Sequence, residues 1–252
     1  MQDIKKWFQK AGVPVVVEKD PISSNSLSVN NTDIFQMSID IKGKKNRKEY
    51  FRMFLGNEEN DIRVIDADPK HQQVILSVHE PYREYIVRVW NFKERKFKEE
   101  LQSTPDFLRK YLMGMDESHL FISELPTNFG PINSVKDAHK ALKPNLVVKK
   151  EKKTSRIKRQ GEWFFIPASS EELNLIEENN NFIEKKAPID RNGGNLHIAD
   201  KILNIRNDIF VTGKICHVEH HTLKLHGWFR VIRNVEVRGT PAGNRRIYNW
   251  VD

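Results

Sequence analysis

Apolar and polar residues alternate through much of the first half of the chain, and the pattern predicts a series of β-strands. The strand-like segments are IFQMSIDI, EYFRMFL, IRVID, QVILSVH and REYIVRVW, separated by short polar turns. Alternation is clearest in the last segment, where Tyr85, Val87 and Val89 share one face. The turns leave no room for crossover helices, so we expect an antiparallel meander.

Helical spacing follows a different pattern in the same half. It appears in the opening segment, which stops at Gly12, and again in ERKFKEELQ, TPDFLRKYLMG and VKDAHKAL. Thr104 is a candidate N-cap, with Pro105 at the first helical position and Gly114 as the stop. The class expected is α+β, with an N-terminal domain (1–145) that combines an antiparallel sheet with about three helices.

The pattern changes again towards the C-terminus. Residues 146–159 are highly charged and lack apolar periodicity, as expected of a basic linker between domains. Beyond them the strand-like segments GEWFFIP, HIADKIL, DIFVTGKI and GWFRVIRNVEV predict a small β-rich domain over 160–252, a barrel or a sandwich.

Composition agrees with a folded chain. The 252 residues are 38% apolar and 30% charged, with 14 Phe and 5 Trp, which is enough bulky apolar surface for two cores. A single Cys excludes an internal disulfide framework, and the opening segment lacks a secretory apolar core, so we expect a reducing cytoplasm. No long apolar run is present, so no membrane partner is expected.

Histidines gather in CHVEHHTLKLHGWFRV, the segment from Cys216 to Val231, and suggest a metal site. A transition-metal centre such as zinc needs three or four nitrogen, oxygen or sulfur donors that converge. His217, Glu219 and either His220 or His221 could supply them from the expected hairpin turn, joined by the distant His197. Cys216 is a fifth possible donor, although strand alternation points it away. The set we select is His197, His217, Glu219 and His221.

This histidine spacing matches no strong metal motif, and partly exposed hairpin histidines are the plainer alternative. A nucleophilic role for Cys216 is weaker still, because adjacent imidazoles in the sequence do not establish geometry. The segment GTPAGNRR lacks the strand, loop and helix context of a phosphate-binding loop.

Two segments of the C-terminal hundred residues resemble a group of small bacterial and phage-type β proteins. They are RQGEWFFIP (Arg159 to Pro167) and HVEHHTLKLHGWFRVIRNVEV (His217 to Val237). That group pairs an RQGD-like opening strand with a later H-x-EH segment and a G-W or G-Y turn. It has no established activity, and Leu196-His197-Ile198 stands here where a two-histidine segment would be expected, so the resemblance supports the domain boundary alone.

The charge pattern suggests a second function. The net charge is +8, and the basic residues cluster in the linker and near the C-terminus beside aromatic residues. Cations bind phosphates while exposed rings stack on unpaired bases, a combination suited to RNA. The candidate nucleic-acid contacts are Lys149, Lys150, Lys152, Lys153, Arg156, Lys158, Arg159, Arg230, Arg233, Arg245, Arg246 and Trp250.

Three hypotheses remain open at this point. The first is a non-catalytic protein that binds nucleic acid, RNA rather than DNA, through those basic and aromatic residues. The second is a metal-dependent hydrolase or nuclease in which an ion held by the histidine hairpin activates water. The third is a scaffold that binds another protein through the sheet of the first domain.

Overall fold

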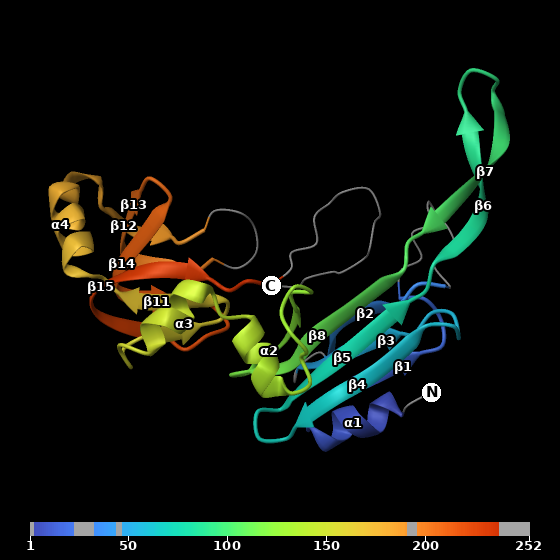
Figure 1. The fold of residues 1–252 in the computed structure, drawn as a ribbon, viewed down its shortest axis with the longest axis horizontal. Coiled ribbons are helices and arrows are strands. Elements are labelled where there is room, and N and C mark those ends of the chain that lie inside the picture. The colour runs from blue at the N-terminus through green and yellow to red at the C-terminus, as the bar shows by residue number, and fades with distance from the viewer. Residues whose placement is uncertain (1–2, 23–32, 44–46, 191–195, 237–252) are drawn as a thin grey trace. The chain divides into compact units, whose positions relative to one another are not determined.

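Strands dominate the protein (Figure 1). The computed structural model describes residues 3–22, 33–43, 47–190 and 196–236; 50% of these residues lie in strands and 15% in helices. The described strands form four sheets, of three, six, four and two strands. The α+β class expected from the sequence is therefore wrong, and the fold is mainly β. The described chain divides into two compact units, one covering 3–115 with 120–138 and the other covering 116–119 with 139–236.

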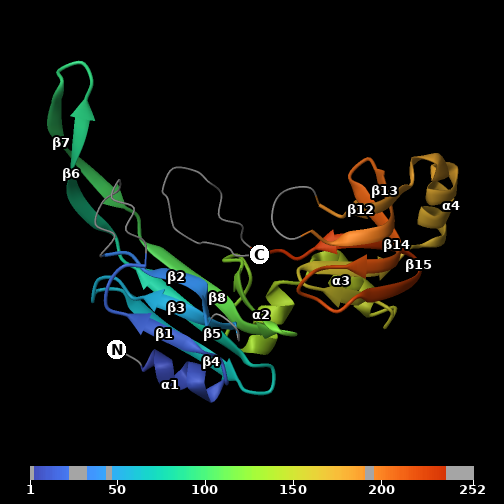
Figure 2. The same ribbon diagram turned by 180° about the vertical axis from the view of Figure 1, so that it is seen from behind.

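Two sheets and one helix build the core of the first unit (Figure 2). The helix is α1 (Ile4–Lys10). The three-stranded sheet has the order β1 (Val15–Glu18), β3 (Lys48–Phe54), β2 (Gln36–Lys42). The four-stranded sheet has the order β4 (Asp61–Asp68), β5 (Gln73–Glu80), β8 (Phe107–Asp116), β9 (His119–Glu124). Phe8 of the helix, Phe51 and Tyr111 are buried in one apolar cluster, which both sheets share.

The pairing of β1 with β3 is parallel, which departs from the antiparallel meander expected. A parallel pair needs a long connection, and here the segment that contains β2 supplies it. The remaining registered pairs of the unit's two core sheets, β2 with β3, β4 with β5 and β5 with β8, are antiparallel.

Two segments expected to be helical are strands. ERKFKEELQ lies largely in β7 (Lys96–Thr104), and TPDFLRKYLMG largely in β8. Phe97 and Leu101 are four residues apart, a spacing that also places two side chains on one face of a strand. In β8, the adjacent residues Tyr111 and Leu112 point to opposite faces and both are buried, so both faces of the strand are covered there. A continuous apolar run does not distinguish a buried strand from a helix.

Strands β6 (Arg83–Asn91) and β7 form a two-stranded ribbon that continues the β5–β8 hairpin (Figure 1). Glu80 pairs with Phe107 and Arg83 pairs with Thr104, so the register is kept across the break between the two pairs of strands. Pro81 and Pro105 lie in this break. Neither has an N–H group to donate, which explains why the ladder of hydrogen bonds stops there.

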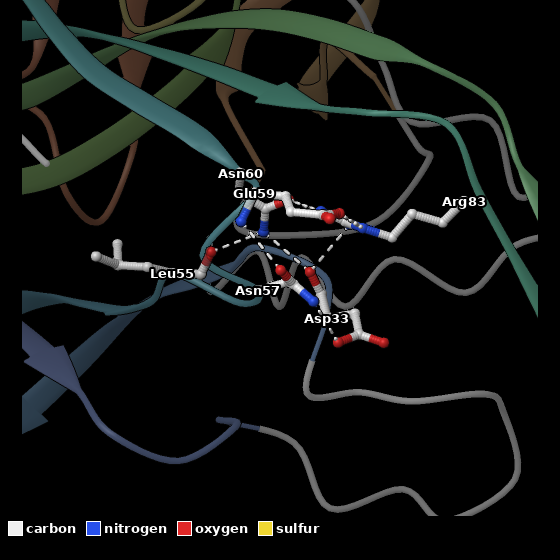
Figure 3. A network of polar contacts seen from close by, with 6 residues as sticks. All are labelled: Asp33, Leu55, Asn57, Glu59, Asn60 and Arg83. Atoms are coloured by element: carbon white, nitrogen blue, oxygen red, sulfur yellow. Dashed lines mark hydrogen bonds and ion pairs between the residues drawn. The ribbon is translucent and has the colours of Figure 1, made fainter.

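The base of the ribbon is held by Arg83 (Figure 3). Its guanidinium donates to Asn60 Oδ1 at 2.7 Å and to the carbonyl of Asp33 at 3.3 Å, and it lies 3.4 Å from Glu59 Oε2. The buried Asn60 in turn donates to the carbonyls of Asp33 and Leu55 at 2.9 and 2.8 Å. One charged side chain therefore ties the first residue of β6 to two loops of the unit.

The second unit is built on one six-stranded sheet rather than the barrel or sandwich of two sheets expected. Its order is β10 (Lys158–Gln160), β11 (Trp163–Pro167), β15 (Leu223–Arg233), β14 (Asp208–Cys216), β13 (Ile198–Ile205), β12 (Glu184–Pro188). Every registered pair in it is antiparallel. The helical segments are α2 (Val135–Ala141), in which the chain passes from one unit to the other, α3 (Asn145–Glu151), α4 (Ser170–Glu178) and a 3-10 turn at Asn180–Phe182.

Both faces of this sheet are covered, as the WFFIP run of β11 shows. Trp163 and Phe165 lie in one buried cluster with residues of β12 to β15. Phe164 and Ile166 point to the opposite face and pack against Val147 of α3. Further along the same sheet, a separate cluster joins Ile176 of α4 to residues of β13 and β14. The period-two alternation of strands therefore supplies two apolar layers from a continuous apolar sequence.

Residues 146–159, expected as a linker, contain most of α3 and the start of β10. Val147 is fully buried, whereas most of the basic side chains that follow are exposed. The longest helix among the described residues is α4, with nine residues, and no described helix could cross a membrane.

Candidate metal centre

Three histidines meet at one end of the six-stranded sheet. Ile198, the first residue of β13, pairs with Cys216, the last residue of β14. The next positions outward on these neighbouring antiparallel strands are His197 and His217, so the register brings their side chains together. His220 comes from the same β14–β15 connection as His217.

The three imidazole rings form a compact group. The ring centroids of His197 and His217 are 4.2 Å apart, with 19° between the planes, which is a stacked arrangement. His220 lies 4.8 Å from His217 and 5.7 Å from His197 by the same measure. One nitrogen from each ring can be chosen so that all three lie within 4.8 Å of one another. We call these three residues the histidine triad.

His197 is the buried member of the triad, with 5% of its surface exposed. Its ring meets that of Trp163 edge-on at 6.5 Å, and its carbonyl accepts a hydrogen bond from the N–H of Ile189 at 2.9 Å. Burial above all, with smaller contributions from the nearby His217, His220 and Arg233, lowers the pKa of His197 from 6.5 to about 3. The ring is therefore neutral at pH 7, which is the form that binds a metal ion.

Two ring nitrogens of the triad are buried without a hydrogen-bond partner. Among the described residues only five buried side-chain nitrogen or oxygen atoms lack a hydrogen-bond partner, and two of them are His197 Nε2 and His220 Nδ1, the latter 4.0 Å from Glu117 Oε1. The other three belong to Gln160, Arg233 and Asn234, all in the same unit. An unpaired buried polar atom is costly, so a cluster of them marks a place where a ligand would be stabilised.

The turn between β10 and β11 borders the rings of His197 and His220. Gly161 has a positive φ of 55°, and a Cβ placed there would lie 2.9 Å from His220 Nε2 and 3.5 Å from His197 Nε2. The preceding Gln160 donates from its side-chain nitrogen to the carbonyl of His221 at 2.7 Å. Glycine therefore leaves space beside two of the three rings, while Gln160 holds the histidine loop in position.

The donor set suits a transition metal. Three imidazoles with an open fourth position are found in zinc sites, where the metal–nitrogen distance is about 2.0–2.1 Å. His217 Nδ1 accepts a hydrogen bond from the N–H of Glu219 at 3.2 Å. Coordination through Nε2 would place a proton on Nδ1, which could then no longer accept the hydrogen bond from Glu219.

The structure brings together His197 and His217 of the set selected from the sequence. The third ring is His220, whereas His221 is exposed and Glu219 half-buried, both outside the triad. His220, which the selected set omits, lies in the β14–β15 connection, because β15 begins at Leu223. The two triad residues of this connection, His217 and His220, have an H-x-x-H spacing in the sequence. Cys216 is exposed and lies 3.9 Å from the Thr222 hydroxyl, measured from sulfur to oxygen.

The residues expected to contact nucleic acid fall into three groups. Six are exposed and one, Lys150, is half-buried; the exposed ones are Lys149, Lys152, Lys153, Arg156, Lys158 and Arg159. Arg230 and Arg233 are held in ion pairs within the unit, the first with Glu172 and Asp208, the second with Glu162 and Asp190. Arg245, Arg246 and Trp250 lie outside the described residues.

Comparison of the chain with protein-family models, curated proteins and solved structures finds no match.

Proposed function

We propose that the second unit binds a divalent transition metal, zinc above all, through His197, His217 and His220. The observation that carries this proposal is the convergence of three imidazoles, within 4.8 Å, from two separate connections of one sheet. Imidazole nitrogen is a preferred ligand of zinc, copper and nickel, and the neutral state of His197 needs no deprotonation.

Three protein ligands leave a coordination position for water. Zinc in such a site lowers the pKa of its bound water to about 7 and so supplies hydroxide for hydrolysis. The proposed activity is metal-dependent hydrolysis.

Metal analysis tests the proposal directly. Purified protein stripped with a chelator and reloaded with zinc should hold about one ion per chain. His220→Ala should lose most of this affinity, whereas the matched control His221→Ala should keep it, because His221 is exposed outside the triad. Substoichiometric metal with no dependence on His220 would contradict the proposal.

Contact with nucleic acid is a second candidate, and the exposure of the basic side chains between Lys149 and Arg159 favours it. The internal ion pairs of Arg230 and Arg233 move the proposed surface away from β15 and onto this segment.

A reducing cytoplasm remains the compartment that the single cysteine favours, and the protein-scaffold hypothesis remains open.

Filter binding of single-stranded RNA, duplex RNA and duplex DNA tests this second candidate. If about four phosphates are engaged on a single strand, the log–log salt slope should be roughly −3. Replacing Lys152 and Lys153 by Ala should flatten that slope, while Arg230→Ala should leave it unchanged. Failure to bind any of the three at low salt would remove the candidate.

A further inference from the structure

One face of the β6–β7 ribbon is apolar and exposed. Ile86 pairs with Leu101 and Trp90 pairs with Phe97, so these four side chains lie on the same face. Ile86 and Leu101 are each 68% exposed and Phe97 is 63% exposed, although all three are large and apolar. Among the described residues the two strands pair only with each other, so no third strand covers them. A contiguous exposed apolar surface of this kind marks an interaction site.

A charged pair lies between the two apolar pairs. Arg88 pairs with Glu99, and Arg88 Nε lies 3.5 Å from Glu99 Oε1, with both side chains largely exposed. Along the ribbon this face therefore presents an apolar pair, a pair of opposite charges, and a second apolar pair. A partner that covers this face must therefore be apolar at both ends and must offer a negative group to Arg88 and a positive group to Glu99.

We infer that a second copy of the chain covers this face. A two-fold axis parallel to the strands places one ribbon over the other with both tips at the same end. Ile86 then faces the partner's Leu101, Trp90 faces the partner's Phe97, and Arg88 faces the partner's Glu99. The same contacts occur twice because the interface is isologous. The ribbon face is therefore self-complementary, because apolar side chains meet apolar side chains and Arg88 meets Glu99.

The alternative arrangement is electrostatically unfavourable. A two-fold axis across the strands would place Arg88 opposite the partner's Arg88 and Glu99 opposite the partner's Glu99. A polyanion is likewise a poor occupant, because Glu99 lies at the centre of the face. The ribbon starts from a fixed base, since Arg83 is tied to Asn60 and Asp33 (Figure 3).

Charge reversal with complementation tests the inference in the full-length protein. Arg88→Glu places a new carboxylate opposite the partner's Glu99, and Glu99→Arg places a new guanidinium opposite the partner's Arg88. Each variant should raise the dissociation constant of the dimer at least about tenfold in sedimentation velocity, because like charges face each other. An equimolar mixture of the two variants should form a heterodimer with the affinity of the original protein restored, because opposite charges then meet at both positions.

The mixture separates loss of the interface from loss of folding, since a misfolded ribbon would not recover on mixing. Arg63→Glu is the matched control, because Arg63 forms a similar exposed ion pair with Asp61 on β4 and should leave self-association unchanged. An original protein that stays monomeric at every concentration would overturn the inference. Two single variants that associate as well as the original protein would overturn it too.

Discussion

The β6–β7 ribbon and the β14–β15 hairpin are both long antiparallel pairs with alternating sequences, yet their surroundings differ completely. The ribbon has no neighbouring strand among the described residues, and both its strands are exposed along most of their length. The strands β14 and β15 lie inside a six-stranded sheet whose two faces are covered by apolar clusters. The β14–β15 hairpin is therefore packed by neighbouring strands and apolar clusters, whereas the β6–β7 ribbon contacts the rest of its unit at its base.

This difference determines what each hairpin can carry. The connection of a covered hairpin has a fixed position, so it can keep the triad rings in place beside a buried His197. Unpaired polar atoms there are tolerated because the surrounding sheet contributes the stability. An uncovered ribbon cannot orient a buried polar site, but it can offer an apolar face to another chain. Burial by neighbouring elements, more than strand length or sequence pattern, therefore determines whether a hairpin can hold a buried polar site.

The largest expected effect is on the free energy of unfolding. The same substitution, Phe to Ala, should lower it much more in the β14–β15 hairpin than in the β6–β7 ribbon. Phe210→Ala removes a fully buried ring from β14 and should lower the free energy of unfolding of the second unit by about 3–5 kcal/mol. Phe97→Ala removes an exposed ring from β7 and should lower the free energy of unfolding by less than about 1.5 kcal/mol. This is the most that its edge-on contact with Trp90 is worth. Denaturant titration at low protein concentration measures both. Equal losses would contradict the contrast.

Acid should destabilise the metal-free second unit through His197. The folded-state pKa is about 3 and the ordinary value is 6.5, so the unfolded state takes up a proton that the folded state refuses. Stability is therefore complete above about pH 6.5 and falls as the pH drops towards 3. Between pH 7 and pH 4 this amounts to about 3 kcal/mol. Thermal or urea unfolding of His197→Gln should show a shallower pH dependence, and an unchanged slope would contradict this origin.

Zinc should stabilise the second unit and leave the ribbon unaffected. Free zinc at about one hundred times its dissociation constant should raise the free energy of unfolding by about 2.7 kcal/mol, because the ion binds the folded state. Calorimetric melting with and without a chelator measures this difference. It should disappear in His217→Ala and persist in His226→Ala, an exposed histidine on β15.

Gly161→Ala should produce the smallest effect. The residue has a positive φ, which alone costs about 1 kcal/mol for an alanine, and the new Cβ would lie 2.9 Å from His220 Nε2. Zinc affinity should fall as well, because the methyl group occupies space beside two rings. Gly227→Ala is the control, since its φ is also positive but nothing lies near its Cβ position. Equal zinc affinity in the two variants would show that the space at Gly161 is unimportant.

Local patterns in the sequence are informative where one physical cause dominates. The buried strand at WFFIP, the hairpin that follows Asp208 and the helix ending near Gly12 are present in the structure. The prediction of helices where the structure has β7 and β8 is wrong, because a spacing of four residues and a continuous apolar run are both compatible with either a helix or a strand.

The histidine triad requires information that no local pattern contains. The density of histidines indicates the connection that supplies two of the three rings, and the sequence also suggests His197 as a distant partner. The choice between His220 and His221 depends on where β15 begins, which is set by pairing of Leu223 with Ile215. Likewise, the ion pairs of Arg230 join β15 to Glu172 of α4 and Asp208 of β14, contacts that only the folded chain creates.

Pro81 and Pro105 divide one continuous register into two regions that should open independently. Amide protons inside β5 and β8 exchange with solvent only when a buried sheet unfolds, whereas those of β6 and β7 need only the ribbon to separate. Hydrogen–deuterium exchange should therefore change abruptly between Glu80 and Arg83 on one strand and between Thr104 and Phe107 on the other. The two prolines would then set the boundary of a cooperative unfolding unit, so that the ribbon can melt and reform while the sheet that carries it stays folded.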